Sequence, residues 1–236
     1  MRIERILEYN AIESTQKVAR SIDRTQPTAV IARIQTGGRG RAGRRWFSPE
    51  GGLWITFMIP YEKKQRLAHY VTMLGSLAVL RAIEPLGVTG QLRWPNDVMI
   101  NHRKVAGILG EYHRGAIICG IGINVNIYHF PSWVGSATSL ALELDQKIEI
   151  SGLREDLIRN FEYAFEQFEE GQGRVIVKLL RPYFTASGDL VTIDYGRSRI
   201  IGTVQDIDEE GALILRTETD KLIKVFSGEM RRVRWS

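Results

Sequence analysis

Four arginines, four glycines and one tryptophan lie within the segment from Gln35 to Trp46. Guanidinium groups form paired hydrogen bonds with phosphate and carboxylate oxygens, and glycines leave the backbone free to close over a ligand. The stretch from Arg24 to Pro49 carries six basic residues and no acidic one, whereas the whole chain has a net charge of +5. The basic charge is therefore local, which favours a small, multiply charged ligand over an extended nucleic-acid surface.

Two other interpretations of this segment are open to test. Disordered Arg/Gly-rich RNA-binding tails are long and repetitive, whereas this segment is short and lies between two strand-like stretches, 28–34 and 53–59. The glycines also match G-x-G-x-x-G, but a dinucleotide site needs a helix at the last glycine, and Pro49 opposes one. An RNA-binding module that stacks bases on Trp46 and Phe47 is kept as an alternative function.

A second polar cluster occupies residues 93–98, with the sequence Arg-Trp-Pro-Asn-Asp-Val. Its proline favours a turn, at whose edge Asn96 and Asp97 present an amide and a carboxylate. Lys104 then enters an otherwise apolar strand. A lone lysine usually keeps its ammonium in water, and the alternative is a cation that reaches into a ligand pocket. Small residues that would leave room for that ligand follow at Ala106, Gly107 and 120–123, and two asparagines end the segment, Asn124 and Asn126.

Composition limits the class of protein. The chain has 236 residues, 44% of them hydrophobic and 25% charged, which is typical of a soluble globular protein of one or two domains. The single cysteine, Cys119, lies among isoleucines, which indicates a buried, inert thiol and a reducing compartment. No apolar run approaches the roughly 20 residues that a membrane span needs. We therefore expect a cytoplasmic protein that has no membrane partner.

Neither a transition-metal site nor a covalent nucleophile is indicated. The four histidines show no metal-ligand spacing and have no cysteine cluster to assist them. The strand-turn-helix motif G-x-S-x-G is absent from the sequence. The chemistry is therefore expected to rest on charge and positioning.

The elements that position these groups can be predicted from local pattern. A strand is expected over residues 2–9, and Ser14 and Thr15 are typical N-cap residues for a short helix that ends near residue 22. Adjacent hairpins indicate a mixed or antiparallel sheet. Further helices are predicted over residues 67–86, 151–169 and 174–184, and further strands over residues 28–34, 53–59, 92–100, 104–112 and 116–125.

The pattern changes after residue 187, where five short strands follow in about fifty residues. They are predicted over residues 189–195, 199–208, 212–217, 221–226 and 230–235. This density of short strands is typical of a barrel of SH3-like size. The fold class expected is therefore α/β (α+β), with a mixed-sheet catalytic domain over residues 1–187 and a small SH3-like β-barrel over residues 188–236.

Taken together, the motifs resemble those of the biotin protein ligase family. The resemblance covers nearly the whole chain, because the motifs occur in the family's order: Ser14-Thr15, residues 38–46, 93–98, 104–107, 120–126 and 137–140. It implies a class II synthetase-like mixed sheet followed by an SH3-like domain. It further implies the form without the N-terminal DNA-binding domain of some members, and hence no DNA partner and no repressor function.

The resemblance also implies a two-step reaction. Biotin and ATP would condense, with Mg²⁺, to biotinyl-5′-adenylate and pyrophosphate, and a lysine of a biotin carboxyl carrier protein would then attack the mixed anhydride. Neither step needs an enzyme nucleophile. A lipoate or octanoate ligase or transferase is the nearest alternative, although the transferases would use a cysteine in a polar setting. Members of this form are often dimers, so a homodimer is a possible assembly.

By the same resemblance, Lys104 and Arg41 are catalytic, with Lys104 between the biotin carboxylate and the α-phosphate. Biotin would contact Ser14, Thr15, Gln35, Gly38, Arg39, Lys104, Ala106 and Gly107. ATP would contact Arg39, Arg41, Trp46, Asn96, Asp97 and Asn124, with Trp46 beside the adenine and Asp97 as a ligand of Mg²⁺.

Three features depart from the family pattern or leave it open. Gln16 stands where the family usually has asparagine after Ser-Thr, and Arg93 stands where it has lysine. A guanidinium fork and an ammonium are not interchangeable. The family's C-terminal arginine facing the nucleotide could be any of three residues, Arg231, Arg232 or Arg234.

Overall fold

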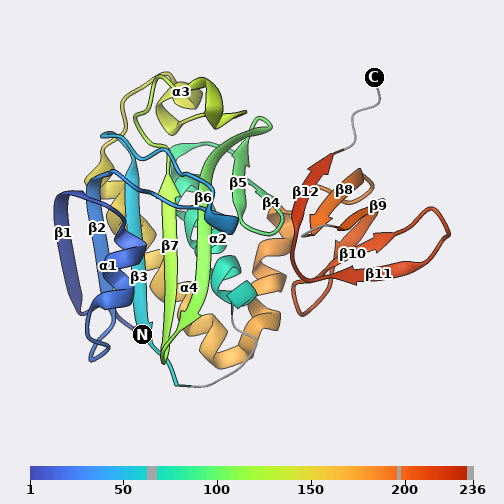
Figure 1. Ribbon diagram of the computed structural model, residues 1–236, viewed down its shortest axis with the longest axis horizontal. Helices are drawn as coiled ribbons and strands as arrows, with labels where there is room; N and C mark the ends of the chain where they lie inside the picture. The colour runs from blue at the N-terminus through green and yellow to red at the C-terminus, as the bar shows by residue number, and fades with distance from the viewer. Residues whose placement is uncertain (63–67, 196–197, 233–236) are drawn as a thin grey trace.

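A seven-stranded mixed sheet forms the body of the molecule in this computed structural model, which describes residues 1–62, 68–195 and 198–232 (Figure 1). The strand order is β1-β2-β3-β7-β6-β5-β4. The first pair is parallel and all other neighbours are antiparallel. The strands are β1 (Arg5–Ile12), β2 (Thr28–Gln35), β3 (Leu53–Pro60), β4 (Gln91–Arg93), β5 (Asp97–Ile100), β6 (Arg103–His113) and β7 (Ala116–Ile123).

The two long helices pack together on one face of this sheet. They are α2 (Ala68–Ile83) and α4 (Ile150–Leu180), and Phe161 of α4 stacks on Phe57 of β3 with ring centroids 3.9 Å apart. The short helix α1 (Thr15–Ser21) lies on the opposite face, over β2, β3 and β7 (Figure 1). Within the described ranges, no helix is long and apolar enough to cross a membrane.

Two helices predicted after residue 150 form one continuous helix, α4, so that prediction was wrong. Helices were predicted over residues 151–169 and 174–184, with a gap at residues 170–173 that the structure does not have. Gly173 instead permits close helix packing, since a Cβ atom there would lie 1.7 Å from Cε1 of Tyr70 on α2. The helix ends only before the 3₁₀ turn Arg181–Tyr183, whose proline cannot continue the α-helical hydrogen bonds.

The remaining short elements connect these layers. Helix α2 passes into the 3₁₀ turn Glu84–Leu86 and ends at Gly87, whose φ is 82°. Residue 67, predicted to begin this helix, lies outside the described residues. Between β7 and α4, the chain forms the 3₁₀ turn Ser132–Val134 and then helix α3 (Leu140–Leu144).

The C-terminal strands form a separate antiparallel sheet of five strands, in the order β11-β10-β9-β8-β12 (Figure 1). They are β8 (Leu190–Tyr195), β9 (Ser198–Ile207), β10 (Leu213–Arg216), β11 (Leu222–Val225) and β12 (Glu229–Arg232). The expected fold class, a mixed α/β sheet followed by a small all-β unit, is confirmed. The domain boundary near residue 187 stays a prediction.

Candidate active site

A cavity of about 490 Å³ opens on the α1 face of the large sheet. Glycines leave part of its floor without side chains, and one of them, Gly120 of β7, lies in register between Thr56 of β3 and Leu109 of β6. Gly122 pairs in the same way with Gly107. Since side chains alternate along a strand, the isoleucines between these glycines face the hydrophobic core. The glycine face therefore leaves the space that a ligand needs.

The start of α1 closes one end of the cavity. The backbone N–H of Thr15 donates to Gln35 Oε1 at 2.8 Å, and the Thr15 hydroxyl donates to the same oxygen at 3.1 Å. Gln35 Nε2 in turn donates to Ser48 Oγ at 3.0 Å. Ser14, the N-cap residue of α1, lies beside them in the cavity wall. The structure thus brings together three residues predicted to contact biotin, namely Ser14, Thr15 and Gln35.

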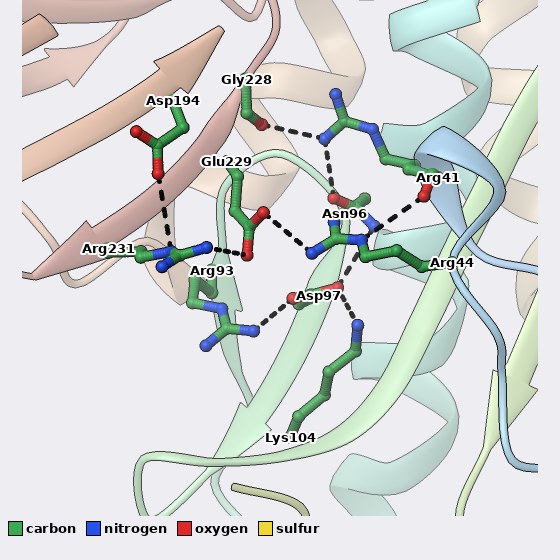
Figure 2. Close-up of polar contacts among 10 residues, drawn as sticks. All are labelled: Arg41, Arg44, Arg93, Asn96, Asp97, Lys104, Asp194, Gly228, Glu229 and Arg231. Atoms are coloured by element: carbon green, nitrogen blue, oxygen red, sulfur yellow. Dashed lines mark hydrogen bonds and ion pairs between the residues drawn. The ribbon is translucent and has the colours of Figure 1, made fainter. Parts of the chain in front are cut away.

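The segment of residues 35–46, called the arginine loop below, covers the cavity. It contacts both the turn that carries Asn96 and the segment that leads into β12. Arg41 Nη1 donates to Asn96 Oδ1 at 3.0 Å and to the carbonyl oxygen of Gly228, next to β12, at 3.1 Å (Figure 2). Arg44 Nη1 lies 2.8 Å from Glu229 Oε2. The loop itself makes a tight 3₁₀ turn, Arg41–Gly43. Residues of three distant segments therefore meet above the sheet, and two of them, Arg41 and Asn96, were predicted site residues.

Asp97 and Lys104 form an ion pair beside the floor. Lys104 Nζ lies 2.5 Å from Asp97 Oδ1, and Arg93 Nη2 lies 2.5 Å from Asp97 Oδ2 (Figure 2). Burial alone would raise the pKa of Asp97, but Lys104 and Arg93 outweigh it, so the pKa is lowered. Burial lowers the pKa of Lys104, which Asp97 opposes. The Asp97 carboxylate is therefore ionised at neutral pH and holds Lys104 in the cavity wall.

Cations dominate the lining of the cavity. Six cationic side chains face it, against the carboxylates of Asp97 and Glu229. The cations are Arg39, Arg41, Arg44, Arg45, Arg93 and Lys104. Like charges gathered in a concave site create a strong local field, so the site is suited to a ligand with several negative charges.

Trp46 lies on the glycine floor. A Cβ atom at Gly107 would lie 2.9 Å from Cζ3 of the indole, and one at Gly122 would lie 2.5 Å from Nε1. Lys104 Nζ is 4.9 Å from the ring centroid. Both glycines are thus required by the tryptophan, whose buried Nε1 has no hydrogen-bond partner within the part of the chain that the structure describes. The predicted place of Trp46 beside adenine stays a prediction.

Ala106 and Gly38 lie outside the cavity lining, and their predicted contacts with biotin stay predictions. Ala106 is fully buried in the hydrophobic core, on the opposite side of β6 from Gly107, because neighbouring strand residues point to opposite faces. Gly38 is absent from the cavity lining. It allows close backbone packing instead, since a Cβ atom there would lie 2.5 Å from Ser48 Oγ.

The other predicted residues are placed as follows. Arg39 lines the cavity and donates from Nη1 to the Gly43 carbonyl oxygen at 3.2 Å. Asn124 also lines it, and its Nδ2 donates to the Thr138 carbonyl oxygen at 3.0 Å. Of the three candidate C-terminal arginines, Arg231 pairs with Glu229 and Asp194 (Figure 2), Arg232 is described only in its backbone, and Arg234 lies outside the described residues.

An aromatic cluster that lies at the mouth of the cavity was not identified from the sequence. Phe47 lies edge-on to Trp133, with centroids 6.0 Å apart, and also contacts Phe130 at 6.4 Å. The Arg45 guanidinium lies 4.9 Å from the centroid of Trp133. The available signal was two aromatic residues around Pro131 in a loop without hydrophobic periodicity. Thr56, Arg44 and Glu229 were also missed.

Comparison with known proteins supports the sequence resemblance. Residues 9–127 match the Biotin/lipoate A/B protein ligase family, and residues 186–231 match the Biotin protein ligase C terminal domain. A bifunctional ligase/repressor BirA of Bacillus spizizenii is 32% identical over 245 residues, which cover 96% of this chain and 74% of that protein. The chain belongs to the biotin protein ligase family.

Other members of this family extend the match. A biotin–[acetyl-CoA-carboxylase] ligase of Mycobacterium tuberculosis is 30% identical, over 79% of this chain and 72% of its own. The solved structure of a biotin protein ligase from Aquifex aeolicus in complex with biotin and ATP superposes with a TM-score of 0.88 and 28% identity. That match covers 99% of this chain and 100% of the other, so the small C-terminal sheet is part of the shared fold.

Proposed function

We propose that this chain is an ATP-dependent biotin protein ligase, which forms biotinyl-5′-adenylate and transfers biotin to a lysine of a biotin carboxyl carrier protein. The observation that carries the proposal is the position of Lys104. Its ammonium lies at the edge of a glycine-floored slot and beneath an arginine-rich cover. Family membership supports the same activity, because the relatives are named as biotin ligases.

The first chemical step brings two anions together, the biotin carboxylate and the α-phosphate of ATP. Their repulsion is offset by preorganised cations, which are worth far more in a site with little water than in bulk solvent. Lys104 is proposed to lie between the two reacting groups, and Arg41 to neutralise the phosphates. Holding both substrates in place supplies a further part of the rate.

Neither step requires an enzyme nucleophile, and the only cysteine does not provide one. Cys119 is fully buried, and burial raises the pKa of its thiol far above the ordinary value. Its Sγ is directed to the Val71 carbonyl oxygen, at 3.5 Å, within the core. Because the thiolate is the reactive form, this burial argues against a cysteine-dependent lipoate or octanoate transferase.

The residues around Asp97 fit a role toward nucleotide and Mg²⁺. Asn96 and Asp97 lie side by side at the cavity wall, with Asn96 Nδ2 donating to Asp97 Oδ1 at 3.2 Å. Among the described residues, no group of three or more potential metal ligands is gathered. Mg²⁺ usually takes one or two carboxylates together with substrate phosphates. We therefore propose Asp97 as the protein ligand of an ion that enters with ATP.

The remaining ligand contacts, the form of the C-terminal sheet, the location and the assembly are also proposals. Ser14, Thr15, Gln35 and Gly107 are assigned to biotin, and Asn124 to ATP, because all five line the cavity. The small C-terminal sheet is proposed to form an SH3-like barrel. We also propose a cytoplasmic location and a homodimer, both from the resemblance to the biotin protein ligase family.

Purified protein should release pyrophosphate from MgATP when biotin is added, and not when lipoate or octanoate is added. A biotin carboxyl carrier protein should then gain one biotin at a single lysine, which intact-mass analysis and peptide mapping would detect. Release with lipoate alone would support the lipoate ligase alternative. Salt-sensitive RNA binding without any pyrophosphate release would support the RNA-binding alternative.

Trp46→Ala is expected to weaken ATP binding by roughly tenfold and biotin binding by less, since stacking of a base on an aromatic ring is worth about 1–3 kcal/mol. Calorimetric titration with biotin and with a non-hydrolysable ATP analogue would measure both effects. Tyr9→Ala, at an exposed aromatic residue on the edge strand β1, is the control. Equal losses for the two ligands would show that Trp46 supports the cavity floor rather than the base.

A further inference from the structure

Gln16 lies at the end of the cavity formed by α1, and two acceptors fix the direction of its amide. The side chain is buried, with 7% exposure, and lines the cavity. Its Nε2 donates to the Leu109 carbonyl oxygen at 3.3 Å and to Glu111 Oε1 at 3.0 Å, both on β6. Carbonyl and carboxylate oxygens only accept hydrogen bonds. The NH₂ group must therefore face β6, and Oε1 must face away from it.

An ion pair holds Glu111 in this arrangement. Arg20, one turn further along α1, donates from Nε to Glu111 Oε1 at 2.6 Å and from Nη2 to Oε2 at 2.5 Å. Two parallel bonds of this kind set the plane of the carboxylate. Gly120 provides the space for the amide, since a Cβ atom there would lie 2.2 Å from Gln16 Oε1. The oxygen thus rests on the glycine floor of the cavity.

The neighbouring groups leave Gln16 Oε1 without a strong donor. The Thr56 hydroxyl lies 3.4 Å from it but only 2.8 Å from Thr15 Oγ1. A hydroxyl has a single proton, which the shorter bond to Thr15 takes. The other amide oxygen at this end, Gln35 Oε1, already accepts two hydrogen bonds from Thr15. Gln16 Oε1 is therefore the amide oxygen that retains capacity to accept from a ligand.

We propose that Gln16 determines the specificity of the cavity for the acid, because its Oε1 accepts a ring N–H of the bound substrate. Glu111 and Arg20 are positioning residues, which keep that oxygen directed into the slot. The inference rests on the proposed ligase function and deepens it. The ureido ring of biotin carries N–H groups, whereas lipoate and octanoate carry none. An acid without such a donor leaves a buried acceptor unpaired and is disfavoured.

The test replaces Gln16 with methionine, which keeps the length of the side chain and removes the oxygen. Calorimetry would give the dissociation constants of biotin, of biotin methylated on both ureido nitrogens, and of an ATP analogue. Gln16→Met should raise the dissociation constant of biotin at least about tenfold, which is the scale expected for one lost buried hydrogen bond. Affinity for the ATP analogue should stay unchanged. The preference for biotin over methylated biotin should narrow, which a purely structural defect would not cause.

Two further variants complete the test. Lys17→Met is the matched control on the same helix, because the Lys17 ammonium is exposed and pairs with Glu13; it should leave every constant unchanged. Arg20→Met removes only the ion partner of Glu111. It should weaken biotin binding less than Gln16→Met does, and it should reduce the preference for biotin over methylated biotin in the same direction. The proposal is overturned if Gln16→Met and Arg20→Met weaken the binding of biotin and of methylated biotin by the same factor, or if neither variant weakens biotin binding. Wild-type protein that binds lipoate in preference to biotin overturns the proposed function instead.

Discussion

Lys104→Ala is expected to reduce the rate of biotinyl-adenylate formation at least about 100-fold, the scale seen when one preorganised group that stabilises transition-state charge is removed. The lost ammonium lies 2.5 Å from Asp97 and next to the glycine floor, where the carboxylate and α-phosphate are proposed to meet. Single-turnover measurement of pyrophosphate release at saturating biotin and MgATP would report this step. Biotin binding alone should fall much less.

A stability measurement and one companion variant separate an effect on chemistry from an effect on folding. Asp97 keeps Arg93 as an ion partner when Lys104 is lost, so the variant should still fold. Its thermal unfolding midpoint would check this. Arg103→Ala, one residue earlier on β6, removes a cation that pairs with Glu143, and it should leave the rate unchanged. A near wild-type rate for Lys104→Ala would mean that this lysine acts only as the partner of Asp97.

Arg41→Gly is expected to leave adenylate synthesis active while releasing the adenylate faster. The Arg41 guanidinium joins Asn96 and Gly228, and its loss removes two of the contacts that hold the loop over the cavity. Weaker closure should appear mainly in the dissociation rate. Released adenylate would acylate exposed lysines of bystander proteins. Incubation of the variant with biotin, MgATP and an unrelated lysine-rich protein, followed by a blot for biotin, would detect it.

The matched control for this variant is Ala42→Gly. Ala42 has a φ of 54°, a conformation that glycine adopts without strain, so this change loosens the same turn but retains Arg41. It should give little bystander labelling. If both variants label bystanders equally, backbone freedom rather than the guanidinium controls release. If Arg41→Gly makes adenylate but labels no more than wild type, the loop is not a barrier to release at this position.

The local sequence pattern predicted most strands and the residue types of the site. Helix continuity, the partners of the arginine loop and the directions of some side chains depend instead on contacts between residues far apart in the chain. The continuity of α4 through Gly173 could not be predicted locally, because Tyr70, against which Gly173 packs, is about a hundred positions away. Strand alternation with Gly107 alone predicts that the Ala106 side chain faces away from the cavity, into the core. Glu229 offered no local signal, because its role depends on β12 lying beside the arginine loop. The same holds for Gln16, whose amide direction is set by residues of β6.

The two hydrogen bonds that reach the C-terminal sheet from the cavity have a consequence for making a smaller enzyme. Trp94, next to the turn that carries Asn96, donates from its buried Nε1 to the Gly211 carbonyl oxygen at 3.0 Å. Arg41 donates to Gly228. A fragment that stops at residue 187 would leave the buried indole N–H of Trp94 without its acceptor, at a cost of about 1–3 kcal/mol. It would also remove the Gly228 carbonyl that Arg41 contacts. Glu229 and Met230 of β12 also line the cavity, so a minimal ligase cut from this chain would have to replace this part of the cavity wall.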